Sequence, residues 1–257
     1  CLSRGLGDVY KRQDFNGGLM MMYNSNLQFT NATQLNDPFD CHPSLIDFSN
    51  VPKEVCGGWT PEIIEELKRE PFRRTREKAW ICSLSKIHNS ILMWSYYSKH
   101  QGICIGLDME KAQKYLSRMY GSVMIGCSEV EVQYKDIVEK PDFFKDAKDF
   151  FQYQISTKAK AWEHEQEVRL FILNPWSTYM KLLPWQNDNK GPIDWKEVRA
   201  FLEIGGECFD SVYLGVNMNT EEKSKIIHVA RKLNPNIKIF QMEIDSNAFR
   251  LNTKIIE

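Results

Sequence analysis

The sequence lacks several features that would assign it to a function class directly. Its seven cysteines are scattered without a Cys-x-x-Cys pair, so neither a zinc ribbon nor a redox dithiol is indicated. No Gly-x-Gly-x-x-Gly motif or Walker loop is present, which argues against a Rossmann or P-loop nucleotide enzyme. No apolar run approaches the roughly 18 residues of a membrane span, and no signal-peptide layout is visible. We therefore expect a soluble, cytoplasmic protein with reduced thiols and no membrane partner.

Net charge is also small. The formal charge is -1, so no global attraction to nucleic acid or to anionic membranes is predicted. Hydrophobic residues make up 42% and charged residues 26% of the 257 residues, which is typical of a globular protein with a substantial core. We expect residues 14–257 to form a single domain.

The first thirteen residues are treated separately. Residues 1–13 lack a starting methionine and look like the translation of adapter sequence at the end of an assembled metagenomic fragment. We exclude them from the fold prediction, and we expect that a true first strand has been lost.

The remaining pattern predicts strands and helices without the regular alternation of βαβ units. Helices are expected at 60–71, 90–99, 109–119, 142–155 and 220–233. Strands are expected at 80–84, 102–107, 129–134, 163–171, 211–216 and 237–242. The helix at 90–99 is rich in apolar and aromatic side chains and should be buried. Residues 176–192 are loop-like. Together these elements predict an α+β fold, with a mixed or antiparallel sheet and flanking helices.

The stretch Lys158–Phe171 concentrates the chemistry of the chain. If its second half is extended, side chains alternate between faces, and one face carries Glu163, Glu165, Glu167 and Arg169. Carboxylates of the same sign at a spacing of about 7 Å repel unless Arg169, water or a ligand compensates. Such a row is either a solvated face with ion pairs or a functional site.

Several motifs in a fixed order resemble a bacterial family of uncharacterised domains, domain of unknown function 2971. They are Leu35-Asn36-Asp37-Pro38-Phe39-Asp40, Cys82-Ser83-Leu84-Ser85, Leu92-Met93-Trp94-Ser95-Tyr96-Tyr97, His100-Gln101-Gly102-Ile103-Cys104-Ile105-Gly106, Trp162-x-x-Glu165-x-Glu167-x-Arg169 and Val212-Tyr213-Leu214-Gly215. The resemblance extends from about Leu27 to the end of the chain. Members of this family typically begin with a short strand that contains Tyr, Lys and Arg. We expect that strand to be missing here.

A second resemblance is to ADP-ribosyltransferases, in which a first-strand Arg or His, a Ser-containing second strand and a Glu-x-Glu strand surround the nicotinamide end of NAD. It implies NAD as co-substrate, with Glu167 as the catalytic carboxylate that stabilises an oxocarbenium-like state, Glu165 to activate the acceptor and Ser83 to support the ribose. The acceptor would be a nucleic acid or a protein. Four further residues are expected to contact the cofactor: Trp94, Tyr96, Tyr97 and Arg169.

Two other interpretations remain open. In the first, the protein is a non-catalytic binding or sensing module, with the charged row as a structural ion network and the aromatic helix as core. In the second, Asp37, Asp40, His100 and Glu165 or Glu167 gather a divalent metal for a nuclease or hydrolase, although their spacing matches no known ligand pattern. The interpretations differ in whether Ser83 and the two glutamates line one cleft, and in whether Asp37 or Asp40 joins them.

Overall fold

The computed structural model describes residues 9–50, 60–72, 76–77, 79–120, 127–173 and 193–256. The helices are α1 Phe15–Tyr23, α2 Pro61–Phe72, α3 Ile91–Ser98, α4 Met109–Tyr120, α5 Phe150–Ser156 and α6 Thr220–Leu233. The strands are β1 Val9–Gln13, β2 Asn26–Asn31, β3 Ala79–Ser85, β4 Ile103–Leu107, β5 Cys127–Glu131, β6 Gln133–Lys135, β7 Thr157–Ala159, β8 Glu167–Leu173, β9 Ile193–Trp195, β10 Arg199–Glu203, β11 Phe209–Leu214, β12 Lys238–Ile244 and β13 Leu251–Ile255.

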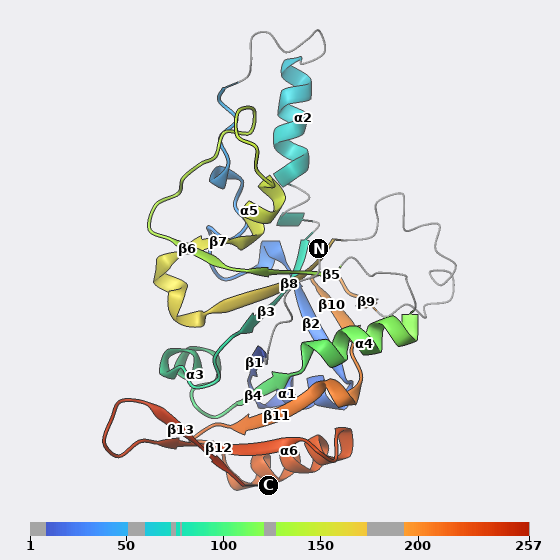
Figure 1. Ribbon diagram of the computed structural model, residues 1–257, viewed down its shortest axis with the longest axis vertical. Coiled ribbons are helices and arrows are strands. Elements are labelled where there is room, and N and C mark those ends of the chain that lie inside the picture. The colour runs from blue at the N-terminus through green and yellow to red at the C-terminus, as the bar shows by residue number, and fades with distance from the viewer. Residues whose placement is uncertain are drawn as a thin grey trace.

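One sheet joins most of the described strands. Its order is β13-β12-β11-β4-β1-β3-β2-β10-β9, and β8 and β5 extend as a branch from β3. Its ladders are antiparallel apart from β11 with β12, and β6 and β7 form a separate parallel pair. β11 to β13 with α6 form one end of the molecule, and β6, β7, α5 and α2 form the other (Figure 1). The predicted α+β class with a mixed, largely antiparallel sheet is confirmed.

Strand β1 shows that the expected loss of a first strand was wrong. Residues 9–13 were excluded from the fold prediction, but they pair with β4 from Val9 to Gln13 and with β3 at Tyr10. The missing strand with Tyr, Lys and Arg is therefore present as β1, which contains Tyr10, Lys11 and Arg12. Gly102 permits the close approach at its end, because a Cβ there would lie 2.2 Å from the Gln13 carbonyl oxygen. The origin of residues 1–13 stays a prediction.

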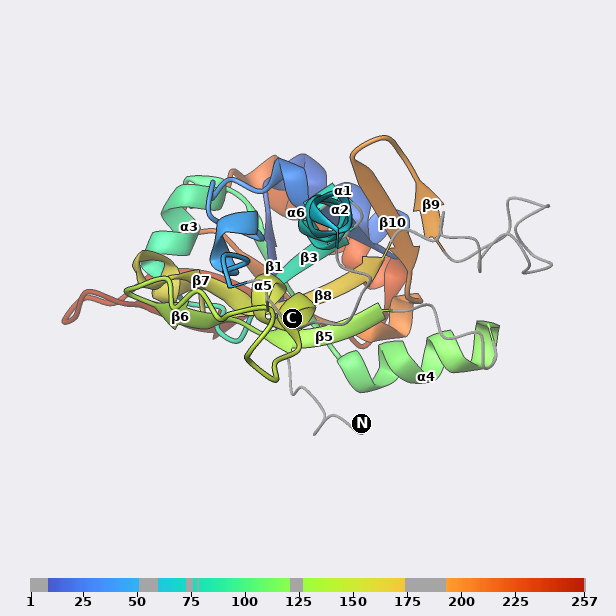
Figure 2. The same ribbon diagram turned by 90° about the horizontal axis from the view of Figure 1, so that it is seen from above.

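The main core lies between the central strands and helices α1, α4 and α6. Helices α1 and α6 lie side by side over the sheet (Figure 2), and each contributes side chains to the core: Met21, Met22, Ile226 and Ala230. The alternating apolar residues of β4 are buried in the same cluster, as their spacing predicted. Among the described residues, none of the helices has the length and apolar character needed to cross a membrane.

Helix α3 is less buried than the sequence predicted. Ser90 caps its first turn, and its buried side chains are Met93 and Trp94. Tyr96 is 65% exposed and Tyr97 42% exposed, so the expectation of a buried helix was wrong. Two large buried residues per two turns are enough to anchor this helix, and its other aromatic side chains point away from the core.

The long helix expected from Asp142 is also wrong, because helical structure begins only at Phe150. Asp142 instead holds a turn, in which its carboxylate accepts hydrogen bonds from the Phe144 amide and from Asn50. Phe143 stacks on Phe48 with ring centroids 4.7 Å apart. These contacts with a distant loop stabilise the turn in place of the helix that the spacing of the apolar residues predicted. The predicted loop at 176–192 lies outside the described residues.

Candidate functional site

A cavity of about 280 Å³ lies where the sheet divides beside β3. Along one edge, β3 pairs with β2 at Trp80 and Ile81 and with β1 at Ser85. Along its other edge it pairs with β8 through all seven residues. The two short contacts leave room between β1 and β2, and polar side chains of both strands and of neighbouring segments line it: Lys11, Arg12, Thr30, Asp40, Ser83, Ser85, Tyr97, Lys158, Glu165 and Glu167.

The two glutamates reach this cavity from different elements. Glu167 is the first residue of β8, whereas Glu165 ends a 3-10 helix that spans Lys160–Glu165. Gln166 between them has a φ of 44°, in the left-handed region, so the backbone is not extended there. The predicted single row is therefore wrong for Glu163, which is exposed to solvent. The Ser85 hydroxyl fixes the turn because it donates to the Glu165 carbonyl at 2.7 Å.

Two buried cations compensate the carboxylates. The Lys158 ammonium donates to Glu165 at 2.6 Å and to Glu167 at 2.9 Å. Arg169 donates to Glu167 from Nε at 2.8 Å and from Nη2 at 3.0 Å. These side chains are almost inaccessible to solvent. Each charged group therefore depends on its ion-pair partners, rather than on water, to offset the free-energy cost of burying its charge. Arg169, one of the compensating groups that the sequence left open, acts together with Lys158, and the expectation of a solvated sheet face was wrong.

Asp40 is the third carboxylate of this network. It is 1% exposed, and Arg169 Nη2 lies 2.8 Å from one of its oxygens and 2.9 Å from the other. The Lys158 ammonium lies 3.9 Å away. Burial raises the pKa of Asp40 above its ordinary value of 3.8, and the nearby charges of Arg169 and Lys158 offset this only in part.

Glu167 and Lys158 have strongly shifted pKa values. Burial alone would raise the pKa of Glu167, but the charges of Arg169 and Lys158 and the hydrogen bonds from Arg169 and Ser83 lower it well below 4.5. Burial alone would lower the pKa of Lys158, but the charge of Glu167, with those of Asp40 and Glu165, raises it above 10.5. Glu167 and Lys158 are therefore fully charged at neutral pH.

This lowered pKa predicts an acid dependence of stability. A carboxylate with a lower pKa in the folded state stabilises the fold above its unfolded value, and the contribution is lost as the pH falls below about 4.5. We expect the difference in free energy of unfolding between the wild type and Glu167→Gln to be largest above pH 5 and to shrink towards pH 3. Urea unfolding across this range measures it, and a difference independent of pH would contradict the expectation.

Ser83 and two tyrosines form hydrogen bonds with the two glutamates, and Ser83 and Tyr97 also line the cavity. Ser83 lies opposite Arg169 in the β3–β8 register, and its hydroxyl bonds to Glu167. Tyr97 donates to Glu165 Oε1 at 2.5 Å, and the Tyr134 hydroxyl accepts the Glu167 amide at 2.8 Å. The structure thus brings together four of the predicted site residues: Ser83, Tyr97, Glu165 and Glu167.

Strand β1 supplies two further cations. Lys11 donates to the Ser83 carbonyl at 2.8 Å, which is the position where β3 has no strand partner on that edge. Arg12 is 8% exposed, donates to the Ile87 carbonyl and contacts the sulfur of Met93, and its Nε has no hydrogen-bond partner. Neither cation forms an ion pair with a carboxylate in the part of the chain that the structure describes. Both therefore remain available to an anionic group in the cavity.

The other predicted site residues, Trp94, Tyr96 and Arg169, do not line the cavity. Trp94 is fully buried in a cluster with Cys104, Tyr213, Met242 and Leu251, and its indole donates to the His88 carbonyl at 2.7 Å. Tyr96 lines a neighbouring pocket, of about 390 Å³, that shares only Tyr97 with the first cavity. Arg169 is 0% exposed and supports the carboxylates from behind rather than lining the cavity.

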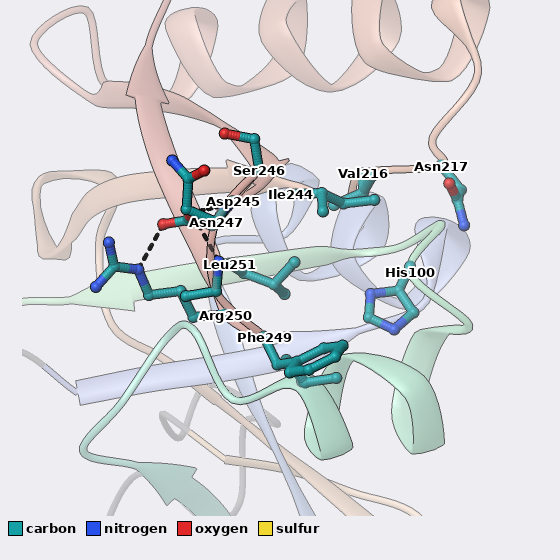
Figure 3. Close-up of a pocket in the computed structure, with 12 residues that line it drawn as sticks. His100, Val216, Asn217, Ile244, Asp245, Ser246, Asn247, Phe249, Arg250 and Leu251 are labelled. Atoms are coloured by element: carbon teal, nitrogen blue, oxygen red, sulfur yellow. Dashed lines mark hydrogen bonds and ion pairs between the residues drawn. The ribbon is translucent and has the colours of Figure 1, made fainter.

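The residues of the metal hypothesis do not come together. Asp40 lines the cavity, but Asp37 does not, and its carboxylate caps its own loop through the Phe39 amide. His100 lines a different pocket, of about 500 Å³, with Asn217 and the β12–β13 hairpin (Figure 3). Asp40, Glu165 and Glu167 do converge, but on the Lys158 ammonium, which occupies the position that a cation would take.

Sequence reasoning missed Lys158, Asp40 as an ion-pair partner and the β1 cations. The signal for Lys158 was its place seven and nine residues before two glutamates, but spacing alone does not indicate that a 3-10 turn folds the lysine back onto them. The β1 cations were excluded with residues 1–13.

The fold and this site define an α+β domain with a buried charge network beside a divided sheet. Residues 93–170 match the family model described as "Protein of unknown function (DUF2971)". The resemblance drawn from the motifs is thereby confirmed over the span that contains Tyr97, Lys158, Glu165, Glu167 and Arg169. No curated protein and no solved structure matches the chain.

Proposed function

We propose that the protein binds NAD in the cavity beside β3 and acts as an ADP-ribosyltransferase or NAD glycohydrolase. One observation carries the proposal: Ser83, Glu165 and Glu167 line one cavity, together with Lys11 and Arg12. A cavity with carboxylates and unpaired cations suits a ligand that carries charge of both signs. NAD has this character, with a pyridinium cation in the nicotinamide and an anionic pyrophosphate.

The reaction breaks the bond between the ribose C1′ and the nicotinamide nitrogen, and the bonding electron pair leaves with neutral nicotinamide. The ribose becomes oxocarbenium-like, and a carboxylate nearby stabilises this developing positive charge. An acceptor hydroxyl or amine, or water, then attacks C1′ and gives up a proton. Catalysis therefore needs a fixed negative charge and a proton acceptor.

The hydrogen bonds of the two glutamates suit them to these two roles. Glu167 receives donors from Lys158, Arg169 and Ser83, so its charge is fixed and few lone pairs remain. Each oxygen of Glu165 receives a single donor, from Tyr97 or from Lys158, and keeps a lone pair for a further hydrogen. We infer that Glu167 stabilises the ribose and that Glu165 accepts the proton of the acceptor.

The size of the cavity limits what it can hold. The volume of about 280 Å³ lies just below the roughly 300–1,000 Å³ found for ligand pockets. This suits the nicotinamide and its ribose, with Tyr97 at the rim and the first phosphate towards Arg12. The adenosine half would extend outside, where a nucleic-acid or protein acceptor would also approach.

A non-catalytic binding or sensing module is the second candidate, and the saturation of Glu167 favours it. A carboxylate held by so many donors is typical of a structural ion network. In this alternative, the cavity binds the same kind of ligand and leaves it unchanged.

Nicotinamide release from NAD tests the proposal. We expect the wild type to release nicotinamide, and Glu165→Gln and Glu167→Gln each to lower the rate by about 100-fold or more. Glu163→Gln is the matched control, because Glu163 is exposed in the same segment, and it should keep full activity. Thermal unfolding of each variant separates lost chemistry from lost folding.

Two results would decide against catalysis. NAD binding without release, measured by calorimetry on the folded wild type, would favour the binding module. If the folded wild type neither binds NAD nor releases nicotinamide, NAD is not the ligand.

A further inference from the structure

We propose that Lys158 is a positioning residue that keeps Glu165 and Glu167 ionised side by side. The inference rests on the proposed function and names the group on which both carboxylates depend. A single ammonium donates to both, at 2.6 Å and 2.9 Å. No protein donor in the described structure other than Lys158 is hydrogen-bonded to both glutamates.

The position of Lys158 is fixed by its own surroundings. It is the middle residue of β7 and pairs with Tyr134 of β6 in a parallel ladder. Its ammonium lies 5.1 Å from the centroid of the Trp162 ring, so an aromatic face covers one side of the charge. Lys158 is 6% exposed, and rotation of the side chain into water would leave two buried carboxylates without their shared cation.

Several elements place titratable or charged groups around this pair of carboxylates. They are Lys11 and Arg12 of β1, Asp40 of the loop after β2, Cys41 beside it, Tyr97 of α3, Tyr134 of β6 and Arg169 of β8. With Lys158 and Arg169 charged, the network holds two cations against three carboxylates. Loss of Lys158 leaves Arg169, which is hydrogen-bonded to Glu167 and Asp40 but not to Glu165.

Carboxylates that share a buried site cannot all stay ionised when a cation is removed. One of them then takes up a proton near neutral pH. We assign this proton to Glu165, because Glu165 loses one of its two donors, whereas Asp40 and Glu167 keep their hydrogen bonds from Arg169. A protonated Glu165 cannot accept a proton from an acceptor. Activity should return only when the pH is high enough to ionise it again.

The test compares Lys158→Met, Lys158→Arg and the double variant Lys158→Met with Glu165→Gln. For nicotinamide release, we expect Lys158→Met to be at least about 10-fold slower at pH 7 and its pH profile to move up by about one pH unit or more. Lys158→Arg keeps the charge and should keep the wild-type profile. A Lys158→Met profile that is merely scaled down would overturn the inference.

A second readout does not depend on NAD. Infrared difference spectra at pH 7 should show an additional protonated carboxyl band in Lys158→Met relative to the wild type, and the band should be absent from the double variant. The double variant should also unfold at a higher urea concentration than Lys158→Met, because it removes a charge that has lost its partner. The absence of the band and no recovery in the double variant would exclude the role of Lys158, whatever the protein does with NAD. If the wild type releases no nicotinamide but the variants show both the carboxyl band and the recovered stability, only the proposed function is rejected.

Discussion

Replacement of Arg169 by methionine should lower the free energy of unfolding by about 3–5 kcal/mol, because it leaves buried carboxylates without their main cation. The guanidinium is 0% exposed and donates to Glu167, to Asp40 and to the Ile155 carbonyl. Methionine fills a similar volume, so little of the loss should come from packing. Urea unfolding at pH 7 measures the change.

Arg118→Met is the matched control for this substitution. Arg118 pairs with Glu207 at 3.1 Å, but its side chain is 67% exposed. An exposed ion pair contributes about 1 kcal/mol or less. Similar losses for the two variants would show that the buried network does not contribute more to the free energy of unfolding than a surface ion pair.

The same experiment at lower pH separates the contribution of the charges to stability from that of packing. As the pH falls below about 4.5, protonation of the carboxylates removes the charge that Arg169 compensates. The difference between the wild type and Arg169→Met should therefore shrink towards pH 3, whereas a packing defect would persist.

Local sequence signals predicted much of the secondary structure. Asp108 caps α4 as expected, and the alternation of Ile103, Ile105 and Leu107 identified β4. These elements follow from caps and periodicity within a few residues, so no information about partners was needed. The α+β class follows from their irregular order in the same way.

The predictions from sequence were wrong where contacts with distant residues determine the local structure. Gln166 adopts a left-handed conformation because the turn before it is held by Ser85, which lies about eighty residues earlier. The division of the sheet beside β3 depends on the pairing of β1 and β2, and periodicity does not reveal which strands pair. The cavity is a product of that pairing. The sequence could therefore indicate Glu165, Glu167 and Ser83 as candidates, but not the lysine between the glutamates.

Trp94 is a clear case in which residue type suggested a ligand contact and the structure assigns a core position. Its ring is fully buried against Cys104, Tyr213 and Met242 and does not line the cavity. The ring also lies under the Arg12 guanidinium, 5.8 Å from its centroid, and so supports one cation of the cavity indirectly. Its effect on a ligand should therefore follow from its effect on stability.

Trp94→Ala should lower the free energy of unfolding by about 3–5 kcal/mol, because it creates a cavity in a packed cluster and removes the donor to the His88 carbonyl. Trp94→Phe keeps most of the apolar contact and should cost less than Trp94→Ala. Tyr96→Ala is the control on the same helix: its side chain is 65% exposed, and the change should stay within about 0.5 kcal/mol. Urea unfolding ranks the three variants. If folded Trp94→Phe lost NAD affinity with wild-type stability, Trp94 would act in ligand binding rather than in the core.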